Sequence, residues 1–239
     1  MAHADSASGA APVGGPAFAG DMSADVVVVG AGPAGASAAY HLAAQGLDVI
    51  LAEKQELGRD KACGDGLTPS AVRELVRMGV DISDWRRNEG LRVIGGGRRL
   101  HIPWPEQVSL PSYGLARRRS DLDRDLAEHA ANAGARLLTG VTVTGPVTNT
   151  AGRVVGVAAR PTARFTYPGI SSPTRLRAPV VIDAGGVSAR LATAMGRDKN
   201  GRRPLGVAVR AYFRSPRAED SWMESRLELW DGPANRSAL

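Results

Sequence analysis

Residues 25–54 read DVVVVGAGPAGASAAYHLAAQGLDVILAEK, and this stretch decides the fold of the 239-residue chain. The β-branched run at 25–29 predicts a strand buried on both faces, as in a parallel sheet. The alanine-rich segment after the glycine turn predicts a helix that ends at Gly46, and residues 48–54 predict a second buried strand. Strand, helix and strand within about thirty residues form a βαβ unit, so the sequence predicts an α/β fold.

The turn of this unit carries a dinucleotide-binding pattern, Gly30-x-Gly32-x-x-Gly35. The first glycine permits a tight turn, the second lets the backbone approach a pyrophosphate, and the third lets helix and strand pack closely. Glu53, at the end of the second strand, can accept hydrogen bonds from ribose hydroxyls. The residues predicted to bind the dinucleotide here are Gly30, Gly32, Pro33, Ala34, Gly35, Glu53 and Lys54. The pattern by itself fits FAD and NAD equally.

A polar, glycine-rich loop, GRDKACGDGL at 58–67, follows the second strand. It has no apolar period, so neither a core helix nor a half-buried strand explains it. The loop holds Cys63, the one cysteine of the chain, together with the basic residues Arg59 and Lys61. We therefore expect a loop that is shaped around a ligand.

Residues 25–54 and the following GRDKACGDGLTPSAVREL resemble the geranylgeranyl reductase family, FAD enzymes related to the flavin monooxygenases. The resemblance runs from about residue 25 to about residue 230. It implies that the segment from Cys63 and Gly64 to Asp65 passes close to the flavin and the substrate, where glycines let backbone lie against a planar cofactor. It also implies that Arg59 and Lys61 can face phosphate or an anionic reduced flavin.

Two further sites follow from the resemblance. Arg119, in the pattern R-x-x-L-D before a predicted helix, matches an arginine that contacts FAD, and its guanidinium suits a pyrophosphate; a solvated basic run at 117–119 is the alternative. The family usually shows Ala-Asp-Gly after a late strand, whereas residues 184–186 read Ala-Gly-Gly, with Gly186 still expected at the cofactor. Asp183 lies two places before the altered position, about 6–7 Å along a strand, so we do not expect it to substitute.

The resemblance implies an FAD-dependent oxidoreductase that reduces C=C bonds of a geranylgeranyl- or menaquinone-type chain, with NAD(P)H as a candidate electron donor. Reduced flavin supplies hydride in this chemistry, and Cys63 and Asp65 are the candidate proton donors. Family members continue for well over a hundred residues past the point where this chain stops. A truncated flavin- or adenine-nucleotide-binding fragment without turnover is therefore one alternative. A NAD-dependent dehydrogenase is another, but it would leave the loop at 58–67 unexplained.

Composition narrows the partners and the compartment. The net charge is +6 and the pI about 10.1, which fits nucleic acid, an anionic membrane surface or a phosphate-bearing cofactor. Scattered arginines and few close aromatic pairs argue against nucleic acid. One cysteine fits a reducing cytoplasm, and four histidines without ligand spacing predict no metal site.

No apolar run approaches the length of about twenty residues that is needed to span a bilayer. We expect a cytoplasmic protein, peripheral at the inner membrane face through its arginines, that acts on a polyprenyl lipid or quinone; the oligomeric state stays open.

The rest of the chain predicts helices and short strands. Residues 68–80 predict a helix with Thr68 as N-cap and with Val72, Leu75 and Val76 on one face. The other predicted elements are a hairpin at 91–104, a helix at 120–133, an antiparallel run at 135–160, a buried parallel-type strand at 178–186, a helix at 187–196, and strands at 205–213 and 226–230.

These elements predict a Rossmann-like FAD-binding domain with an inserted, mostly antiparallel β layer for the substrate, in an incomplete flavin monooxygenase-like fold. The FAD-binding domain is discontinuous and comprises residues 23–90 and 113–200. Residues 91–112 and 201–239 form parts of an incomplete substrate domain. Residues 1–22, rich in Ala, Gly, Ser and Pro, are predicted to be a disordered extension.

Overall fold

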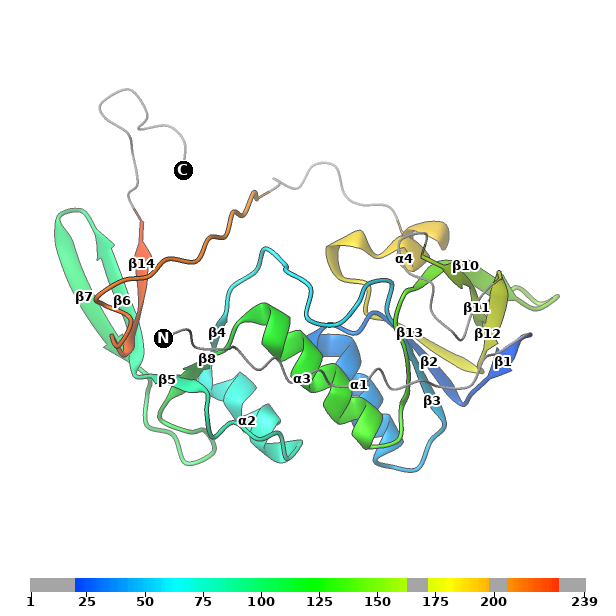
Figure 1. The fold of residues 1–239 in the computed structure, drawn as a ribbon, viewed down its shortest axis with the longest axis horizontal. Coiled ribbons are helices and arrows are strands. Elements are labelled where there is room, and N and C mark those ends of the chain that lie inside the picture. Colours follow the sequence, from blue (N-terminus) through cyan, green and yellow to red (C-terminus); the bar gives the residue numbers. More distant parts are fainter. Residues whose placement is uncertain (1–19, 163–171, 198–205, 228–239) are drawn as a thin grey trace, which may run out of the picture.

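The computed structural model describes residues 20–162, 172–197 and 206–227 (Figure 1). Its centre is a parallel sheet with the strand order β13-β2-β3-β9. The strands are β2 (Val26–Val29), β3 (Val49–Ala52), β9 (Arg136–Leu138) and β13 (Val180–Asp183). The chain extends the sheet on one side of β2 and later returns to its other side. The carboxyl ends of β2 and β13 therefore form the switch point at which such sheets bind ligands.

Helices α1 (Pro33–Ala43) and α3 (Arg119–Asn132) pack together over one face of this sheet. α1 starts with a proline at its first position, where the missing N–H costs no hydrogen bond. Its buried side is made of small residues, among them Ala39 and Ala43, which lets the helix approach β2 and α3 closely. The predicted βαβ unit is confirmed.

A second sheet covers the opposite face with the order β1-β12-β11-β10. Its strands are β1 (Met22–Ser23), β10 (Val141–Thr148), β11 (Val154–Pro161) and β12 (Thr174–Arg177). Because side chains alternate along a strand, Val27 of β2 packs toward this sheet while Val26 and Val28 pack toward the helices. After β13 the chain forms the turn η1 (Gly186–Ser188) and the short helix α4 (Arg190–Ala194), which packs on β10.

Two predictions about these sheets are wrong in detail. Met22 was placed in a disordered extension, but it pairs with Leu176 and is only 4% exposed, because it completes the apolar layer under β2. Residues 135–160 were predicted as one antiparallel run. The first part, β9, instead pairs in parallel with β3, where Leu138 is buried at the sheet edge.

A third layer packs beside the helices α1 and α3. Helix α2 (Pro69–Arg77) packs on the small sheet β4-β8-β5, formed by β4 (Gly66–Leu67), β8 (Gly114–Ala116) and β5 (Arg86–Asn88). Thr68 occupies the N-cap position as predicted but makes no capping bond with its side chain. Val72 and Leu75 are buried, whereas Val76 is 56% exposed. Its predicted place on the buried face is wrong, because the core side of α2 continues through Met78 instead.

The far end of the molecule is a separate sheet with the order β14-β6-β7 (Figure 1). It contains β6 (Gly90–Gly95), β7 (Arg98–Pro103) and β14 (Trp222–Arg226). The predicted hairpin is confirmed, and Gly96 and Gly97 turn it with φ values of 57° and 71°. The strand predicted at 205–213 is not formed by residues 206–213, and the later strand begins at Trp222 rather than at 226. Residues 205 and 228–230 lie outside the described residues.

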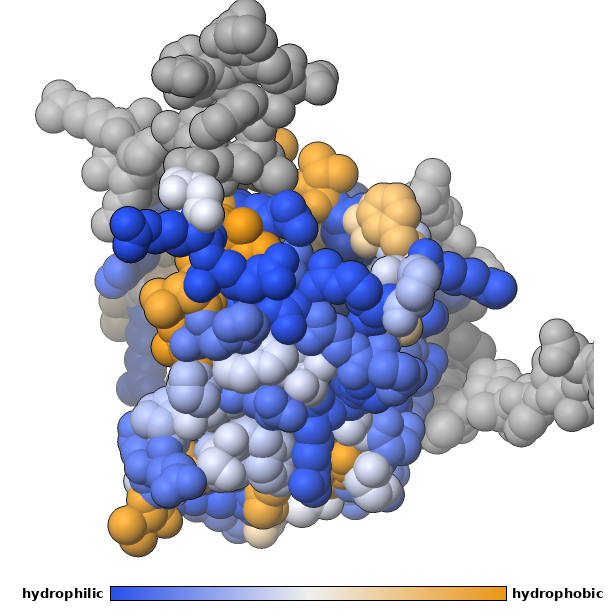
Figure 2. Space-filling model, turned by 90° about the vertical axis from the view of Figure 1, so that its left-hand side faces the viewer, coloured by the Kyte–Doolittle hydropathy of each residue, from blue (hydrophilic) through white to orange (hydrophobic). Residues whose placement is uncertain are grey.

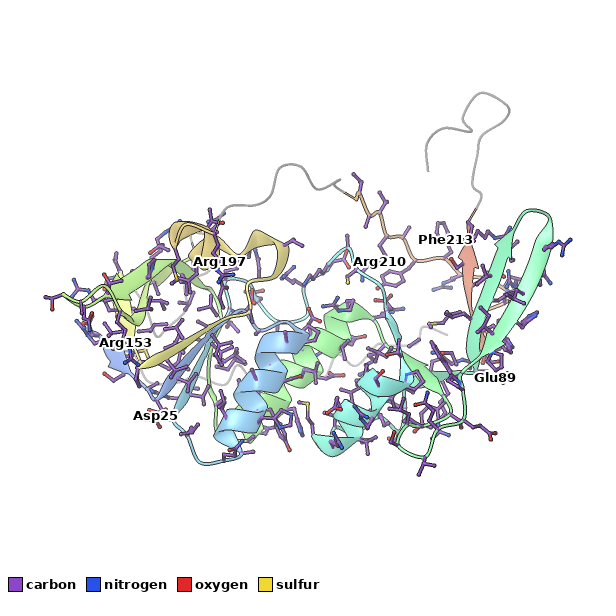
Figure 3. All side chains as sticks on the ribbon, turned by 180° about the vertical axis from the view of Figure 1, so that it is seen from behind. Asp25, Glu89, Arg153, Arg197, Arg210 and Phe213 are labelled. Atoms are coloured by element: carbon purple, nitrogen blue, oxygen red, sulfur yellow. The ribbon has the colours of Figure 1, made fainter. Side chains whose placement is uncertain are left out.

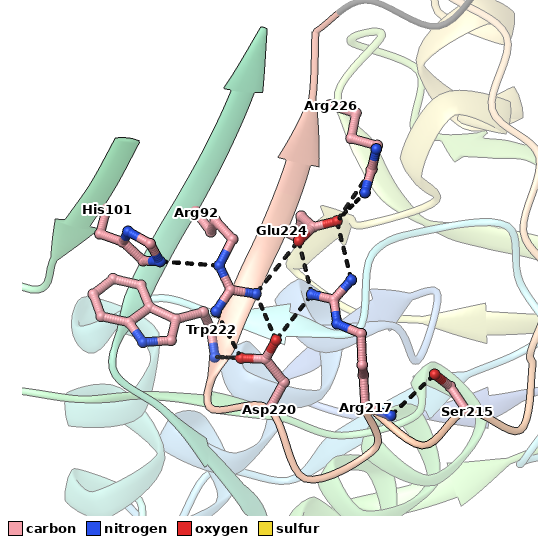
Figure 4. Close-up of polar contacts among 8 residues, drawn as sticks. All are labelled: Arg92, His101, Ser215, Arg217, Asp220, Trp222, Glu224 and Arg226. Atoms are coloured by element: carbon pink, nitrogen blue, oxygen red, sulfur yellow. Dashed lines mark hydrogen bonds and ion pairs between the residues drawn. The ribbon is translucent and has the colours of Figure 1, made fainter. Parts of the chain in front are cut away.

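An ionic network on one face of this sheet holds β14 in place (Figure 4). The Arg92 guanidinium donates to Asp220 at 3.0 Å and to Glu224 at 3.3 Å, and its Nε donates to a ring nitrogen of His101 at 3.0 Å. Arg217 bridges the same two carboxylates at 2.9 and 2.8 Å. The network links β6, β7, β14 and the turn before β14. The side of the molecule that carries this sheet is mostly hydrophilic (Figure 2).

The network predicts a stability that depends on acid pH. Hydrogen bonds from Arg217, Arg92 and Arg226 lower the pKa of Glu224 from its usual 4.5 to about 2. A lowered pKa in the folded state stabilises the fold at pH values above 4.5, and this contribution is lost as pH falls toward 2. We expect Glu224→Gln to lower the urea midpoint, followed by tryptophan fluorescence, at pH 6 but not near pH 2. A difference from wild type that stayed constant over this range would contradict the prediction.

Candidate cofactor-binding site

A cavity of about 330 Å³ opens at the carboxyl ends of β2, β3 and β13. Seven residues that the sequence predicts for the cofactor line it: Gly30, Gly32, Glu53, Lys54, Arg59, Lys61 and Gly186. The cavity therefore lies at the switch point of the parallel sheet, and the predicted dinucleotide motif forms part of its wall.

The three glycines of the dinucleotide-binding motif have different structural roles. Gly30 has a φ of +100°, and a β-carbon there would lie 2.6 Å from the carbonyl oxygen of Ala184. A β-carbon on Gly35 would overlap the Gly30 carbonyl, so this glycine is needed for packing inside the turn. A β-carbon on Gly32, by contrast, would meet no atom within 4 Å. The open space above Gly32 is where a ligand can approach the backbone at the start of α1.

Glu53 is held in a fixed orientation at the end of β3. It is only 9% exposed, and its two carboxylate oxygens accept hydrogen bonds from the backbone N–H groups of Ala31 at 2.9 Å and Gln55 at 3.0 Å. Each carboxylate oxygen can accept a further bond. The side chain is therefore anchored to the glycine turn and still able to accept hydrogen bonds from ribose hydroxyls.

Basic side chains dominate the charge of the cavity wall. The four that line it are Lys54, Arg59, Lys61 and Arg190. None of the four forms a side-chain hydrogen bond or ion pair with another residue in the part of the chain that the structure describes. The two acidic residues of the wall, Glu53 and Asp183, accept bonds from backbone N–H groups instead. The cavity thus offers unpaired positive charge, which suits a ligand that carries a pyrophosphate.

Asp183 holds the turn that contains Gly185, the glycine found where the resemblance predicts an aspartate. Its carboxylate accepts hydrogen bonds from the N–H groups of Gly185 at 3.0 Å and Ala192 at 2.9 Å, which closes the turn between β13 and α4. A β-carbon on Gly185 would lie 3.0 Å from this carboxylate and 3.2 Å from Ala189. Asp183 lines the cavity, although its carboxylate is already bonded to the backbone.

The predicted loop contributes residues to the cavity wall, whereas Arg119 does not line the cavity. Arg119 is 6% exposed and binds Asp123 through two nitrogens at 2.9 and 2.7 Å. Asp65 accepts a hydrogen bond from the Arg119 N–H at 2.9 Å, at the start of α3. Cys63 is exposed and unoxidised, and neither it nor Gly64 lines the cavity. The cofactor roles of Arg119, Cys63 and Gly64 stay predictions.

Sequence reasoning missed part of the wall. Pro33, Ala34 and Gly35 form the first turn of α1 behind the cavity rather than its lining. The lining residues that were not predicted are Val29, Ala52, Ala62, Val141, Thr142, Val143, Asp183, Ala184, Gly185, Val187, Arg190 and Leu191. The β10 residues among them have no sequence signal, because only the packing of the second sheet on β3 brings them to the cavity.

The glycine geometry predicts that two similar substitutions have opposite effects. Gly30→Ala should destabilise the fold by roughly 1–3 kcal/mol, because alanine disfavours a positive φ and its methyl would meet the Ala184 carbonyl. Gly32→Ala should leave the melting temperature unchanged but weaken FAD binding about tenfold, equal to about 1.4 kcal/mol. Thermal unfolding without cofactor and FAD titration measure the two effects. Wild-type FAD affinity in Gly32→Ala would contradict this assignment of the open space.

Comparisons with known proteins agree with this geometry. The chain is 39% identical over 210 residues to a menaquinone reductase of Mycolicibacterium smegmatis, covering 86% of this chain and 48% of that protein. It is 32% identical over 196 residues to a digeranylgeranylglycerophospholipid reductase of Methanosarcina acetivorans, covering 79% of this chain and 44% of that protein. A solved geranylgeranyl bacteriochlorophyll reductase-like protein from Thermoplasma acidophilum superposes with a TM-score of 0.62 at 27% identity, covering 74% of this chain and 43% of that one.

The chain spans about half the length of the curated relatives it matches. The expected Rossmann-like FAD-binding fold and the expected kinship with geranylgeranyl reductases are both confirmed. A family model described as an FAD binding domain matches residues 23–231, and the chain belongs to this family.

Proposed function

We propose that this chain binds FAD for the reduction of C=C bonds in a polyprenyl chain of the geranylgeranyl or menaquinone type. The family supports FAD as the cofactor. The names of two relatives, a menaquinone reductase and a digeranylgeranylglycerophospholipid reductase, support a prenyl lipid or quinone as the substrate. The proposal depends most on the cavity, whose unpaired basic residues and open Gly32 backbone fit a dinucleotide.

The residues of the cavity have separate tasks in this proposal. Glu53 would accept hydrogen bonds from a ribose, while the N-terminus of α1 and the basic wall residues would hold the pyrophosphate. Reduced FAD, when bound, supplies hydride to one carbon of the double bond, and a proton completes the other carbon. The chain itself orients the cofactor against the substrate and keeps water away from the reacting atoms.

The sheet β14-β6-β7 offers an apolar surface for a prenyl chain. Its register places Leu91, Ile102 and Met223 side by side on the face opposite the ionic network. Ile102 remains 43% exposed on this face. The Met223 side chain contacts Gly66 so closely that a β-carbon there has no room, so the apolar face turns toward the loop at 58–67. An apolar substrate beside this loop would lie between the sheet and the FAD-binding domain.

The proton donor is proposed from the loop residues. Cys63 has an exposed, free thiol, which leaves it able to exchange a proton. The Asp65 carboxylate accepts bonds from the Arg119 N–H and from Arg210, so its structural task competes with proton donation.

NAD(P)H is the proposed electron donor. No helix among the described residues is long and apolar enough to cross a bilayer. We propose contact with the inner face of the membrane through arginines, where a prenyl lipid would be met.

FAD binding without turnover is the second candidate function. The observation that favours it is that neither of the two candidate proton donors, Cys63 and Asp65, lines the cavity.

One assay separates the two candidates. The purified chain is loaded with FAD, reduced with NAD(P)H or dithionite, and mixed with menaquinone or a geranylgeranyl lipid. The proposal predicts oxidation of the flavin together with a product that stays heavier by two hydrogen atoms per reduced C=C bond after reoxidation in air, measured by mass spectrometry; a reduced quinone ring would lose the added hydrogens. Cys63→Ala should slow this step without changing FAD affinity, with Asp65→Asn as the comparison. Tight FAD binding with no mass change for any donor and substrate would leave the second candidate.

A further inference from the structure

Segment 206–213 passes over the loop at 58–67 and joins it to the distant sheet (Figures 1 and 3). The side chain of Arg210, only 12% exposed, points from this segment onto the loop and forms ion pairs with Asp60 and Asp65. Its contact with Asp65 joins Nη1 and Oδ1 at 3.2 Å. The guanidinium also lies over the ring of Tyr212, 4.9 Å from its centre. One arginine therefore bridges two carboxylates of the same loop.

One of the loop residues contacted by Arg210 lies between two residues of the cavity wall. Arg59 and Lys61 line the cavity, and Asp60 between them contacts Arg210 instead. Asp60 does not line the cavity, and its side chain is 83% exposed. The ion pair with Arg210 thus holds the loop at a residue directly between two basic residues of the wall.

The second carboxylate connects this contact to a rigid part of the fold. Asp65 accepts the N–H of Arg119 at 2.9 Å at the first residue of α3, and its carbonyl accepts the N–H of Arg117 at 3.0 Å. Burial and a hydrogen bond to Asp65 raise the pKa of Tyr212, which places this ring at the same junction. Arg210 therefore ties the polar loop to helix α3 through Asp65 and contacts the loop a second time through Asp60.

We propose that Arg210 is a positioning residue, which holds the loop at 58–67 so that Arg59 and Lys61 face the bound cofactor. The inference rests on FAD occupying the cavity, as proposed above. Segment 206–213 can have this role although it does not form the predicted strand. Preorganised cations bind an anionic group more tightly because less freedom is lost on binding.

A simpler explanation would be that Arg210 only adds positive charge near the cavity. The two explanations predict opposite results for Asp60→Asn. If charge alone mattered, removing a carboxylate would make the site more positive and would strengthen FAD binding. If Arg210 positions the loop, the same change removes one of its two anchors and weakens FAD binding.

The single cysteine allows the loop to be observed directly, without cofactor. A nitroxide label on Cys63, which is exposed and lies between the two anchors, reports loop motion by electron paramagnetic resonance. We expect Arg210→Gln and Asp60→Asn each to narrow the spectrum of the FAD-free protein and to speed tryptic cleavage after Arg59 and Lys61. Arg210→Lys, which keeps the charge but not the two-pronged geometry, should give an intermediate spectrum.

FAD titrations of the unlabelled proteins complete the test. We expect about threefold weaker binding in Arg210→Gln and in Asp60→Asn, the size expected for a partly exposed ion pair. The double variant should be no weaker than Arg210→Gln, because the coupled residues share one effect. The control is Arg214→Gln, at the residue directly after segment 206–213, which is exposed and without a side-chain partner among the described residues and should match wild type.

Three results would overturn the inference. One is a Cys63 label whose mobility in Arg210→Gln equals that of wild type. Another is tighter FAD binding in Asp60→Asn, which would leave only the effect of charge. The third is an equal effect of Arg214→Gln. Asp60→Asn changes an exposed side chain and should fold normally, and the label and proteolysis need no FAD. A chain that fails to bind FAD would therefore refute the proposed function and leave the loop anchoring tested.

Discussion

The rest of this structure depends on the close approach of backbone at the glycine turn after β2. Gly30 lies against the carbonyl of Ala184, and Gly35 lies against Gly30 itself. No side chain fits between β2, α1 and the end of β13, so these three elements converge on one point. Their convergence puts the N-terminus of α1 and the end of β13 at the same cavity. A β-carbon at either glycine would separate the elements and would remove the cavity along with the packing.

The charge of the cavity wall depends on which of its charged side chains are already bonded to backbone groups. Glu53 and Asp183 bind N–H groups of neighbouring turns, and so they fix the local fold as well as lining the site. The basic side chains of the wall have no such partners among the described residues. This division leaves positive charge unbalanced where a pyrophosphate would lie. The Asp183 carboxylate also leaves little room for a side chain at position 185.

The sheet β14-β6-β7 has an ionic face and an apolar face, and the two faces make different contacts. The ionic network around Arg92 fixes β14 to the hairpin on one face. The apolar residues on the other face, among them Met223, turn toward the loop at 58–67. Segment 206–213 connects this sheet to the loop through Arg210. The proposed substrate surface and the loop proposed to face the cofactor are thus linked through a segment without regular structure.

The sequence by itself determined the βαβ unit, the glycine turn, Glu53 and the hairpin, because local periodicity and turn chemistry specify these features within about thirty residues. It also identified the FAD-binding family through the loop around Cys63. Only the tertiary structure decided that β9 joins the parallel sheet, that Val76 faces solvent and that Asp183 and Arg190 line the cavity. The pairing of Arg210 with Asp60 was likewise decided there. Contacts between residues more than a hundred positions apart depend on how whole layers pack, and no local pattern encodes that packing.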